Sequence, residues 1–237
     1  REGIRLQPRL QEGVRLYTYS SESGDFHAEN IRIGGGEIVF DYVSPLGNIS
    51  DVQLGVPVAI NIENGIAAMA LAQLSGVSKE DIKTGMASFR GVDRRFDFKI
   101  KTDKVVYLSD YAHHPEEIKQ SILSMRALYE GKRLTGIFQP HLYTRTRDFY
   151  QEFADSLSLL DEVILTDIYP ARELPIEGVS SQLIYDNLRP DIDKTLCKKE
   201  EVIDILKKKE IEVLMTLGAG DIENYAPQIC EILNERC

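Results

Sequence analysis

Imidazole and guanidinium groups gather in two short segments of the sequence. Residues 110–115 and 139–145 hold three of the chain's four histidines: His113, His114 and His141. The second segment also holds Arg145, four residues after its histidine. Such groups together suit the binding of phosphate or carboxylate oxygens. A structural interpretation stays equally open from the spacing alone, namely one surface histidine, one helix-capping histidine and ordinary loop arginines.

Metal binding is a rival use for histidines. His113 and His114 are adjacent, so on a strand their side chains would point to opposite faces. The sequence contains neither a CxxC pair nor an HExxH pattern. We therefore expect no structural zinc site. The odd number of cysteines predicts reduced thiols in a cytoplasmic protein. These are Cys197, Cys230 and Cys237.

Three weaker features each allow a functional and a structural interpretation. Asn61 and Asn64 share one face at an expected helix start, where an amide can pair with adenine but can equally cap the helix. The glycine-rich turn 218–221 could hold phosphate at a helix start. We favour a tight turn whose aspartate caps the helix. Arg94 and Arg95 could hold a phosphate, but adjacent arginines are more often a solvated pair.

The elements that would position these residues alternate between strand and helix after Phe96. Alternation of this kind predicts a parallel sheet with right-handed crossovers, and ligands bind at the carboxyl ends of its strands. The two histidine segments each follow a predicted strand. We expect strands at 105–108, 134–138, 162–166 and 212–217, and helices from Pro115 and at 147–160, 181–188, 200–209 and 222–233.

Before that point the sequence is first strand-like and then helical. Short strands are expected at 15–20, 28–33 and 37–42, with a hairpin turn at residues 34–36. Because no helix follows this glycine triplet, it is not a phosphate loop. Helices are expected at 61–76 and after Ser78. The change of pattern predicts two domains, 1–95 and 96–237.

Composition limits the partners. The net charge of −10 argues against binding to nucleic acid, which needs a surplus of lysine and arginine. No apolar run approaches the roughly 20 residues that span a bilayer, so no membrane partner is expected. The chain begins at Arg1 rather than Met, and we expect it to be a piece of a longer protein.

Six motifs in a fixed order resemble the Mur ligases. They are Asn61-x-x-Asn64, Gly91–Asp97, Asp110–Pro115, Phe138–Thr146, Tyr169–Ile176 and Leu217–Asp221. The resemblance implies an α/β chain: the remainder of a central ATPase domain over 1–95, then a Rossmann-like C-terminal domain with a mainly parallel sheet over 96–237. The family's phosphate loop and UDP-binding domain have no counterpart here, so the expected partner is the missing N-terminal half of the same enzyme.

The resemblance also implies a reaction. A Mur ligase uses ATP and Mg²⁺ to phosphorylate a carboxylate, and an amine then attacks the acyl phosphate. The F-Q-P-H order at residues 138–141 resembles the branch that adds L-alanine to UDP-N-acetylmuramate in peptidoglycan synthesis. Its sister, which attaches a recycled tripeptide, resembles F-E-P-R there and remains an alternative, as does a non-catalytic nucleotide-binding module. The fragment alone is expected to be inactive.

Residue roles carried over from the resemblance are expectations. Catalytic groups facing the acyl phosphate or the substrate carboxylates would be His113, His141 and Arg145. Nucleotide would contact Asn61 and Asn64 at adenine, Arg95 at the phosphates, Asp110 at the ribose, and Tyr111 nearby. Arg172 would bind substrate, and no metal ligand is assigned.

The sequence departs from the family pattern at three places. Residues 57–61 read Pro-Val-Ala-Ile-Asn, where the family usually has Pro-Gly-basic-His-Asn. Leu142 replaces the usual arginine after the second-loop histidine, and Ser109 replaces a usual aspartate. One anion contact is therefore lost at Leu142, and Arg145, Arg147 or Arg172 would have to supply that charge.

Overall fold

The computed structural model describes residues 11 and 13–235. The chain forms two compact units, one ending at Arg90 and the other beginning at Gly91. The sequence had placed this boundary slightly later, between Arg95 and Phe96. No helix in the described residues is long and apolar enough to cross a membrane.

Within the described residues, the first unit is a small antiparallel sheet with two helices. Its strands are β1 (His27–Gly34), β2 (Glu37–Val43) and β3 (Ile49–Gln53), in the order β1-β2-β3. The hairpin turn predicted at the glycine triplet is confirmed, because β1 pairs with β2 directly across it. The strand predicted at 15–20 is wrong: only Tyr19 forms a bridge, to Phe26, so a single pairing replaces a ladder. The sequence did not predict β3.

The two helices of this unit are α2 (Ile60–Leu74) and α3 (Lys79–Ser88). Ser78 starts α3 as predicted, since its hydroxyl accepts a hydrogen bond from the backbone N–H of Asp81 at 3.1 Å. Alternate residues of β2 and the inner side of α2 make the core, which includes Phe40, Tyr42 and Ile66.

The second unit is built on a six-stranded sheet in the order β4-β5-β9-β6-β7-β8. β4 runs antiparallel to β5, and every other neighbouring pair is parallel, which confirms the mainly parallel sheet. The edge strands β4 and β8 were not predicted. The strands are β4 (Asp97–Lys101), β5 (Val106–Asp110), β6 (Leu134–Phe138), β7 (Glu162–Leu165), β8 (Asp193–Leu196) and β9 (Val213–Leu217).

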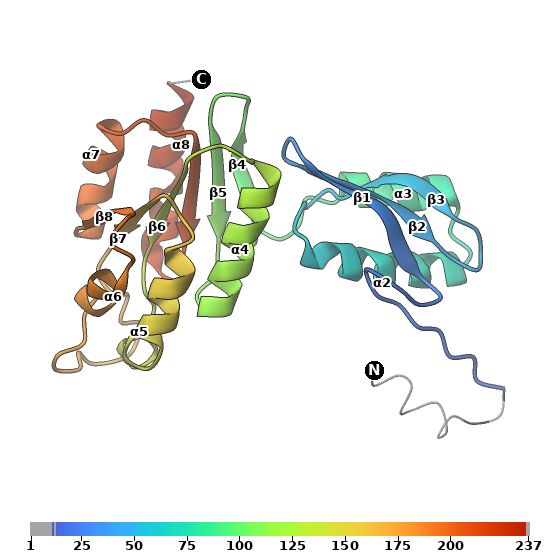
Figure 1. The fold of residues 1–237 in the computed structure, drawn as a ribbon, viewed down its shortest axis with the longest axis horizontal. Coiled ribbons are helices and arrows are strands. Elements are labelled where there is room, and N and C mark those ends of the chain that lie inside the picture. The colour runs from blue at the N-terminus through green and yellow to red at the C-terminus, as the bar shows by residue number, and fades with distance from the viewer. Residues whose placement is uncertain (1–10, 12, 236–237) are drawn as a thin grey trace. The chain divides into compact units, whose positions relative to one another are not determined.

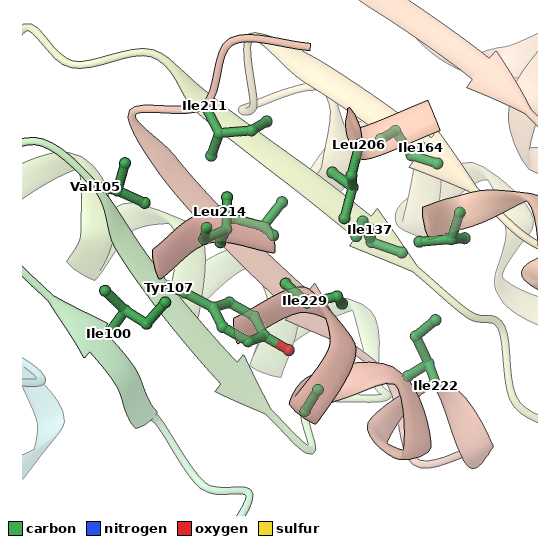
Figure 2. Packing of buried hydrophobic residues seen from close by; sticks show 13 residues of the cluster. Ile100, Val105, Tyr107, Ile137, Ile164, Leu206, Ile211, Leu214, Ile222 and Ile229 are labelled. Atoms are coloured by element: carbon green, nitrogen blue, oxygen red, sulfur yellow. The ribbon is translucent and has the colours of Figure 1, made fainter. Parts of the chain in front are cut away.

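Helices cover both faces of this sheet. Along one face lie α4 (Pro115–Leu128), α5 (Tyr143–Leu157) and α6 (Gln182–Asn187) (Figure 1). The other face is covered by α7 (Val202–Lys207) and α8 (Ala226–Asn234), which follow the short 3₁₀ turns η2 (Lys199–Glu201) and η3 (Asp221–Tyr225). Figure 2 shows Tyr107, Ile137 and Leu214 of the central strands packed against this second layer.

The strand order creates a switch point. From β5 the chain moves through β6 and β7 to β8, and then returns to place β9 between β5 and β6. The helices after β6 and β9 therefore leave toward opposite faces. A crevice for ligand is expected outside the carboxyl ends of such strands. The loops that begin there follow β5, β6 and β9, and they contain the two histidine segments.

Candidate active site

Two imidazole rings meet at this edge of the sheet. His113 follows β5 and His141 follows β6, and their ring centroids are 6.3 Å apart. Tyr111 packs edge-on against His113 at 5.2 Å, and Tyr169 stacks on His141 at 5.6 Å. The structure thus brings together histidines from two loops that are separated in sequence. His114 does not join them, because it precedes α4 and packs on Phe149.

The start of α4 holds His113 in place. Pro115 opens the helix, as predicted, and Glu117 turns back so that one carboxylate oxygen accepts the backbone N–H groups of His113 and His114 at 3.0 and 3.1 Å. The same oxygen lies 3.5 Å from Nδ1 of His113. Burial acts to raise the pKa of Glu117. The N–H groups and the two imidazoles lower it by more, so the net pKa lies below its usual value.

His141 is held from α5. Nη1 of Arg145 lies 3.4 Å from Nδ1 of His141, one helical turn away. Burial, then the charge of Arg145 and then His113, lower the pKa of His141, while Glu173 opposes them. These surroundings disfavour the protonated form of His141. Arg145 therefore supplies the permanent positive charge of this cluster.

The start of α5 differs from the sequence prediction. The helix begins at Tyr143, not at residue 147, and ends at Leu157. Glu173, from the loop after β7, accepts the backbone N–H of Thr144 at 3.0 Å and its hydroxyl at 2.5 Å. A carboxylate at this place satisfies free N–H groups and the positive end of the helix dipole. The cap comes from a distant part of the chain, so local sequence could not show it.

Arg94, and not Arg95, contacts the loop after β5. The guanidinium carbon of Arg94 lies 4.8 Å from the ring centroid of Tyr111, a cation–π geometry. Its Nη2 donates to the carbonyl oxygen of Gly220 at 3.1 Å, and its Nε lies 3.7 Å from Glu223. Arg95 is exposed, so its expected contact with nucleotide phosphates stays a prediction. Nothing in the spacing distinguished these two neighbours.

The carboxylate of Asp110 accepts hydrogen bonds from residues of the second unit, to which it belongs. Its Oδ2 accepts the hydroxyl of Ser121 at 2.7 Å, and its Oδ1 accepts the N–H of Ala112 at 3.3 Å. Burial raises the pKa of Asp110. These contacts fix the end of β5 against α4, and the ribose contact stays a prediction. Arg172 is exposed on the loop after β7, where its neighbour Glu173 makes the contact with α5.

The side chain of Gln139 occupies the space beside the glycine-rich turn after β9. Gln139 is buried, and its amide donates to Asp221 at 2.8 Å and accepts the N–H of Ile222 at 2.9 Å. Asp221 also pairs with Lys199. Gly220, and not Asp221, is the N-cap residue of η3, so the predicted capping role of Asp221 is wrong. The side chain of Asp221 ties the loop after β6 to the loop after β9.

The asparagine pair lies at the start of α2 in the first unit. Nδ2 of Asn64 donates to Oδ1 of Asn61 at 3.2 Å, and Nδ2 of Asn61 donates to the carbonyl oxygen of Val56 at 3.2 Å. The two amides therefore form one chain of hydrogen bonds that ends at Asn64. Neither side chain caps the helix, because the N-cap residue is Ala59 with no side-chain hydrogen bond. Their expected adenine contact stays a prediction.

The second unit is thus a doubly wound α/β unit with a histidine and arginine site at its switch point. Residues 94–222 match the family profile described as "Mur ligase, glutamate ligase domain". The chain belongs to the Mur ligase family.

Named relatives and solved structures agree with this family. A protein from Phocaeicola vulgatus named UDP-N-acetylmuramate–L-alanine ligase is 78% identical over 236 residues, which is 100% of this chain and 52% of the relative. The chain thus spans about half the length of the curated relatives it matches.

Two solved structures share the fold. A crystal structure of UDP-N-acetylmuramate–alanine ligase MurC from Thermotoga maritima superposes with a TM-score of 0.76 at 24% identity, covering 93% of this chain and 48% of that one. MurF ligase from the same organism, in complex with ADP, gives 0.69 at 17% identity, covering 99% and 52%. At these identities the likeness concerns the fold alone.

Proposed function

We propose that this chain is part of an ATP-dependent ligase that joins L-alanine to UDP-N-acetylmuramate in peptidoglycan synthesis. The observation that carries the proposal is the cluster of His113, His141 and Arg145 at the switch point of the sheet. The 78% identical relative that bears the name of this ligase supports the choice of substrates. Because ATP and the UDP-linked sugar are nucleotides of the cytoplasm, we place the enzyme there.

The proposed reaction has two steps. The γ-phosphoryl group of ATP passes to the lactyl carboxylate, giving an acyl phosphate and ADP. The amine of L-alanine then attacks the acyl carbon: a C–N bond forms, the C–O bond to phosphate breaks, and phosphate leaves with a proton from the amine. Both steps place negative oxygens near the reacting carbon, so fixed positive and hydrogen-bonding groups accelerate them.

The residues of this chain would bind and orient the substrates and the nucleotide. Arg145 would hold a carboxylate or phosphate oxygen, and the two imidazoles would contact the reacting groups beside it. Arg172 would add charge from the loop after β7, and Asn61, Asn64 and Arg95 would contact nucleotide. Among residues 11 and 13–235, no group of three or more His, Cys, Asp or Glu side chains could hold a metal ion. We therefore assign no Mg²⁺ ligand and derive no step through it.

Phosphate release tests the proposal. The protein at the full length of its curated relatives would be given ATP, Mg²⁺ and UDP-N-acetylmuramate, with L-alanine or with L-Ala-D-Glu-diaminopimelate. We expect release that depends on L-alanine. Release only with the tripeptide would identify the recycling ligase instead, and release with neither would leave a nucleotide-binding module. The 237-residue chain alone is expected to release no phosphate.

A further inference from the structure

The hydrogen-bond partners of His113 fix the place of its proton. Nδ1 lies 3.0 Å from the carbonyl oxygen of Tyr111 and 3.5 Å from the carboxylate of Glu117. Both neighbours only accept hydrogen bonds, so Nδ1 must carry a hydrogen. In the neutral ring the lone pair is then on Nε2. A carboxylate or carbonyl behind one ring nitrogen commonly selects the tautomer in this way.

The partner of His141 selects the opposite tautomer. Nδ1 of His141 faces Nη1 of Arg145 at 3.4 Å, and a guanidinium group only donates. Nδ1 must therefore present its lone pair to the arginine. The hydrogen of the neutral ring is then on Nε2, which is a donor and has no lone pair for a proton. Two rings 6.3 Å apart thus differ in what they offer to a ligand.

The charged neighbours of the two rings favour the same assignment of tautomers. His113 is faced by Glu117 from α4, whose carboxylate lies beside Nδ1, and by His141. His141 is faced by Arg145 from α5, by His113 and by the more distant Glu173, with Tyr169 stacked on its ring. Burial and Arg145 lower the pKa of His141, which disfavours its protonated form. Of the two rings, His113 is the one whose Nε2 presents a lone pair.

We propose that the opposite tautomers give the two histidines separate roles: His113 accepts a proton at Nε2 from the ammonium group of the incoming amino acid, and His141 donates its Nε2–H to an anionic oxygen of the reacting groups. This inference rests on the proposed function. The proton moves from the substrate ammonium to Nε2 of His113, which leaves a neutral amine with a lone pair for attack. Glu117 is then a positioning residue that acts through His113.

The tautomers can be measured without any enzyme activity. Long-range ¹H–¹⁵N correlation spectra of this chain, labelled with ¹⁵N-histidine, distinguish an Nδ1–H ring from an Nε2–H ring. The chain has four histidines, so His113→Gln and His141→Gln suffice to assign the two signals. We expect Nδ1–H for His113 and Nε2–H for His141 at a pH where both are neutral. The same tautomer on both rings would overturn the inference.

Isosteric variants of the full-length protein test the roles in catalysis. The amide of glutamine takes the place of Nε2, so it can donate there but cannot accept a proton. His141→Gln keeps a donor at this place, so it should lower the L-alanine-dependent rate less than His141→Asn does. His113→Gln should lower kcat by about 100-fold or more, the usual contribution of a general base. His114→Gln is the matched control, because His114 packs on Phe149 outside the cluster.

The pH profile separates a proton acceptor from a merely structural residue. A base that must be unprotonated gives the rate an acid limb, so this limb should disappear in His113→Gln and persist in His141→Gln. Glu117→Gln removes a negative charge beside His113 and should move the limb to lower pH.

The two proposals fail in different ways. If the wild-type protein shows no L-alanine-dependent release, the proposed function fails while the spectra still decide the tautomers. If the wild type is active and His113→Gln keeps its rate and its acid limb, the function stands and this inference is overturned.

Discussion

Replacing Gly220 by alanine should break the connection between two loops of the site. A Cβ at this position would lie 2.1 Å from Oε1 of Gln139 and 2.9 Å from Cβ of Tyr169, whereas ordinary contacts begin at 3.4 Å. The Gln139 amide would therefore have to move by more than 1 Å (3.4 − 2.1 = 1.3 Å). At that displacement it loses its hydrogen bonds to Asp221 and Ile222.

The cost follows from those two bonds. Each contributes about 0.5–1.5 kcal/mol net, and leaving the buried N–H of Ile222 without a partner adds about 1–3 kcal/mol. Backbone strain adds nothing, because Gly220 has an extended conformation with φ −87° and ψ −155°. Alanine makes the unfolded chain less flexible than glycine does, which offsets about 0.4–1 kcal/mol of this loss of stability. We expect the free energy of unfolding of the second unit to fall by about 1–5.5 kcal/mol in urea denaturation followed by circular dichroism.

A double-mutant cycle tests the cause. In a Gln139→Ala background the overlap with the amide is gone and only the 2.9 Å contact with Cβ of Tyr169 remains, so Gly220→Ala should cost at least about 1 kcal/mol less than in the wild type. Gly178→Ala is the matched control: φ is +77° and nothing lies within 4 Å of the new Cβ, so its cost is backbone strain alone and should not depend on Gln139. A Gly220→Ala variant within about 0.5 kcal/mol of wild type would refute the reasoning.

Three further substitutions test the frame around the site. Glu173→Gln weakens the cap of α5 and should raise KM for L-alanine more than it lowers kcat in the full-length enzyme; an unchanged KM would show that the cap positions nothing. Burial raises the pKa of Asp161, but its ion pair and hydrogen bonds hold the net pKa below the usual value. Its contribution to stability is therefore present above about pH 4 and is lost as pH falls through the folded-state pKa, so Asp161→Asn should flatten that acid loss in urea titrations. Gly136→Ala places a Cβ 2.3 Å from Leu160 and should cost about 1–3 kcal/mol of unfolding free energy, which Leu160→Ala in the same protein should partly relieve; equal costs in both backgrounds would contradict the overlap.

The interior of the second unit could be predicted because its residue types leave few choices. β6 was predicted with its correct bounds, since Leu134–Phe138 is buried at every position and lies between polar segments. The start of α4 followed from Pro115. The edge strands β4 and β8 were missed. β8 is short, polar and only partly buried, so its composition does not mark it, and β4 (DFKIK) alternates polar and apolar residues over only five positions.

The site could be predicted only as far as topology determines it. The rule that ligands bind beyond the carboxyl ends of parallel strands placed His113 and His141 at one edge, and their rings do lie close together. The residues that orient these histidines could not be predicted in the same way. Glu117 and Glu173 act through contacts with backbone and imidazole groups, and Glu173 is 29 residues from its partner Thr144. Local spacing contains no signal for such a contact.

Leu142 shows how these tertiary contacts shape the site. Its backbone has φ +76° and ψ 136°, a conformation that costs a residue other than glycine about 1–3 kcal/mol. The surrounding contacts oppose that cost: the N–H of Leu142 donates to the carbonyl of Tyr169 at 2.9 Å, and the N–H of Tyr169 donates to Pro140 at 2.8 Å. These bonds continue the pairing of β6 with β7 as far as His141 and fix that ring on Tyr169. The helix can then begin at once, which brings Arg145 back to His141. The strained turn is therefore what places a guanidinium group behind an imidazole, and the tautomer of His141 follows from it.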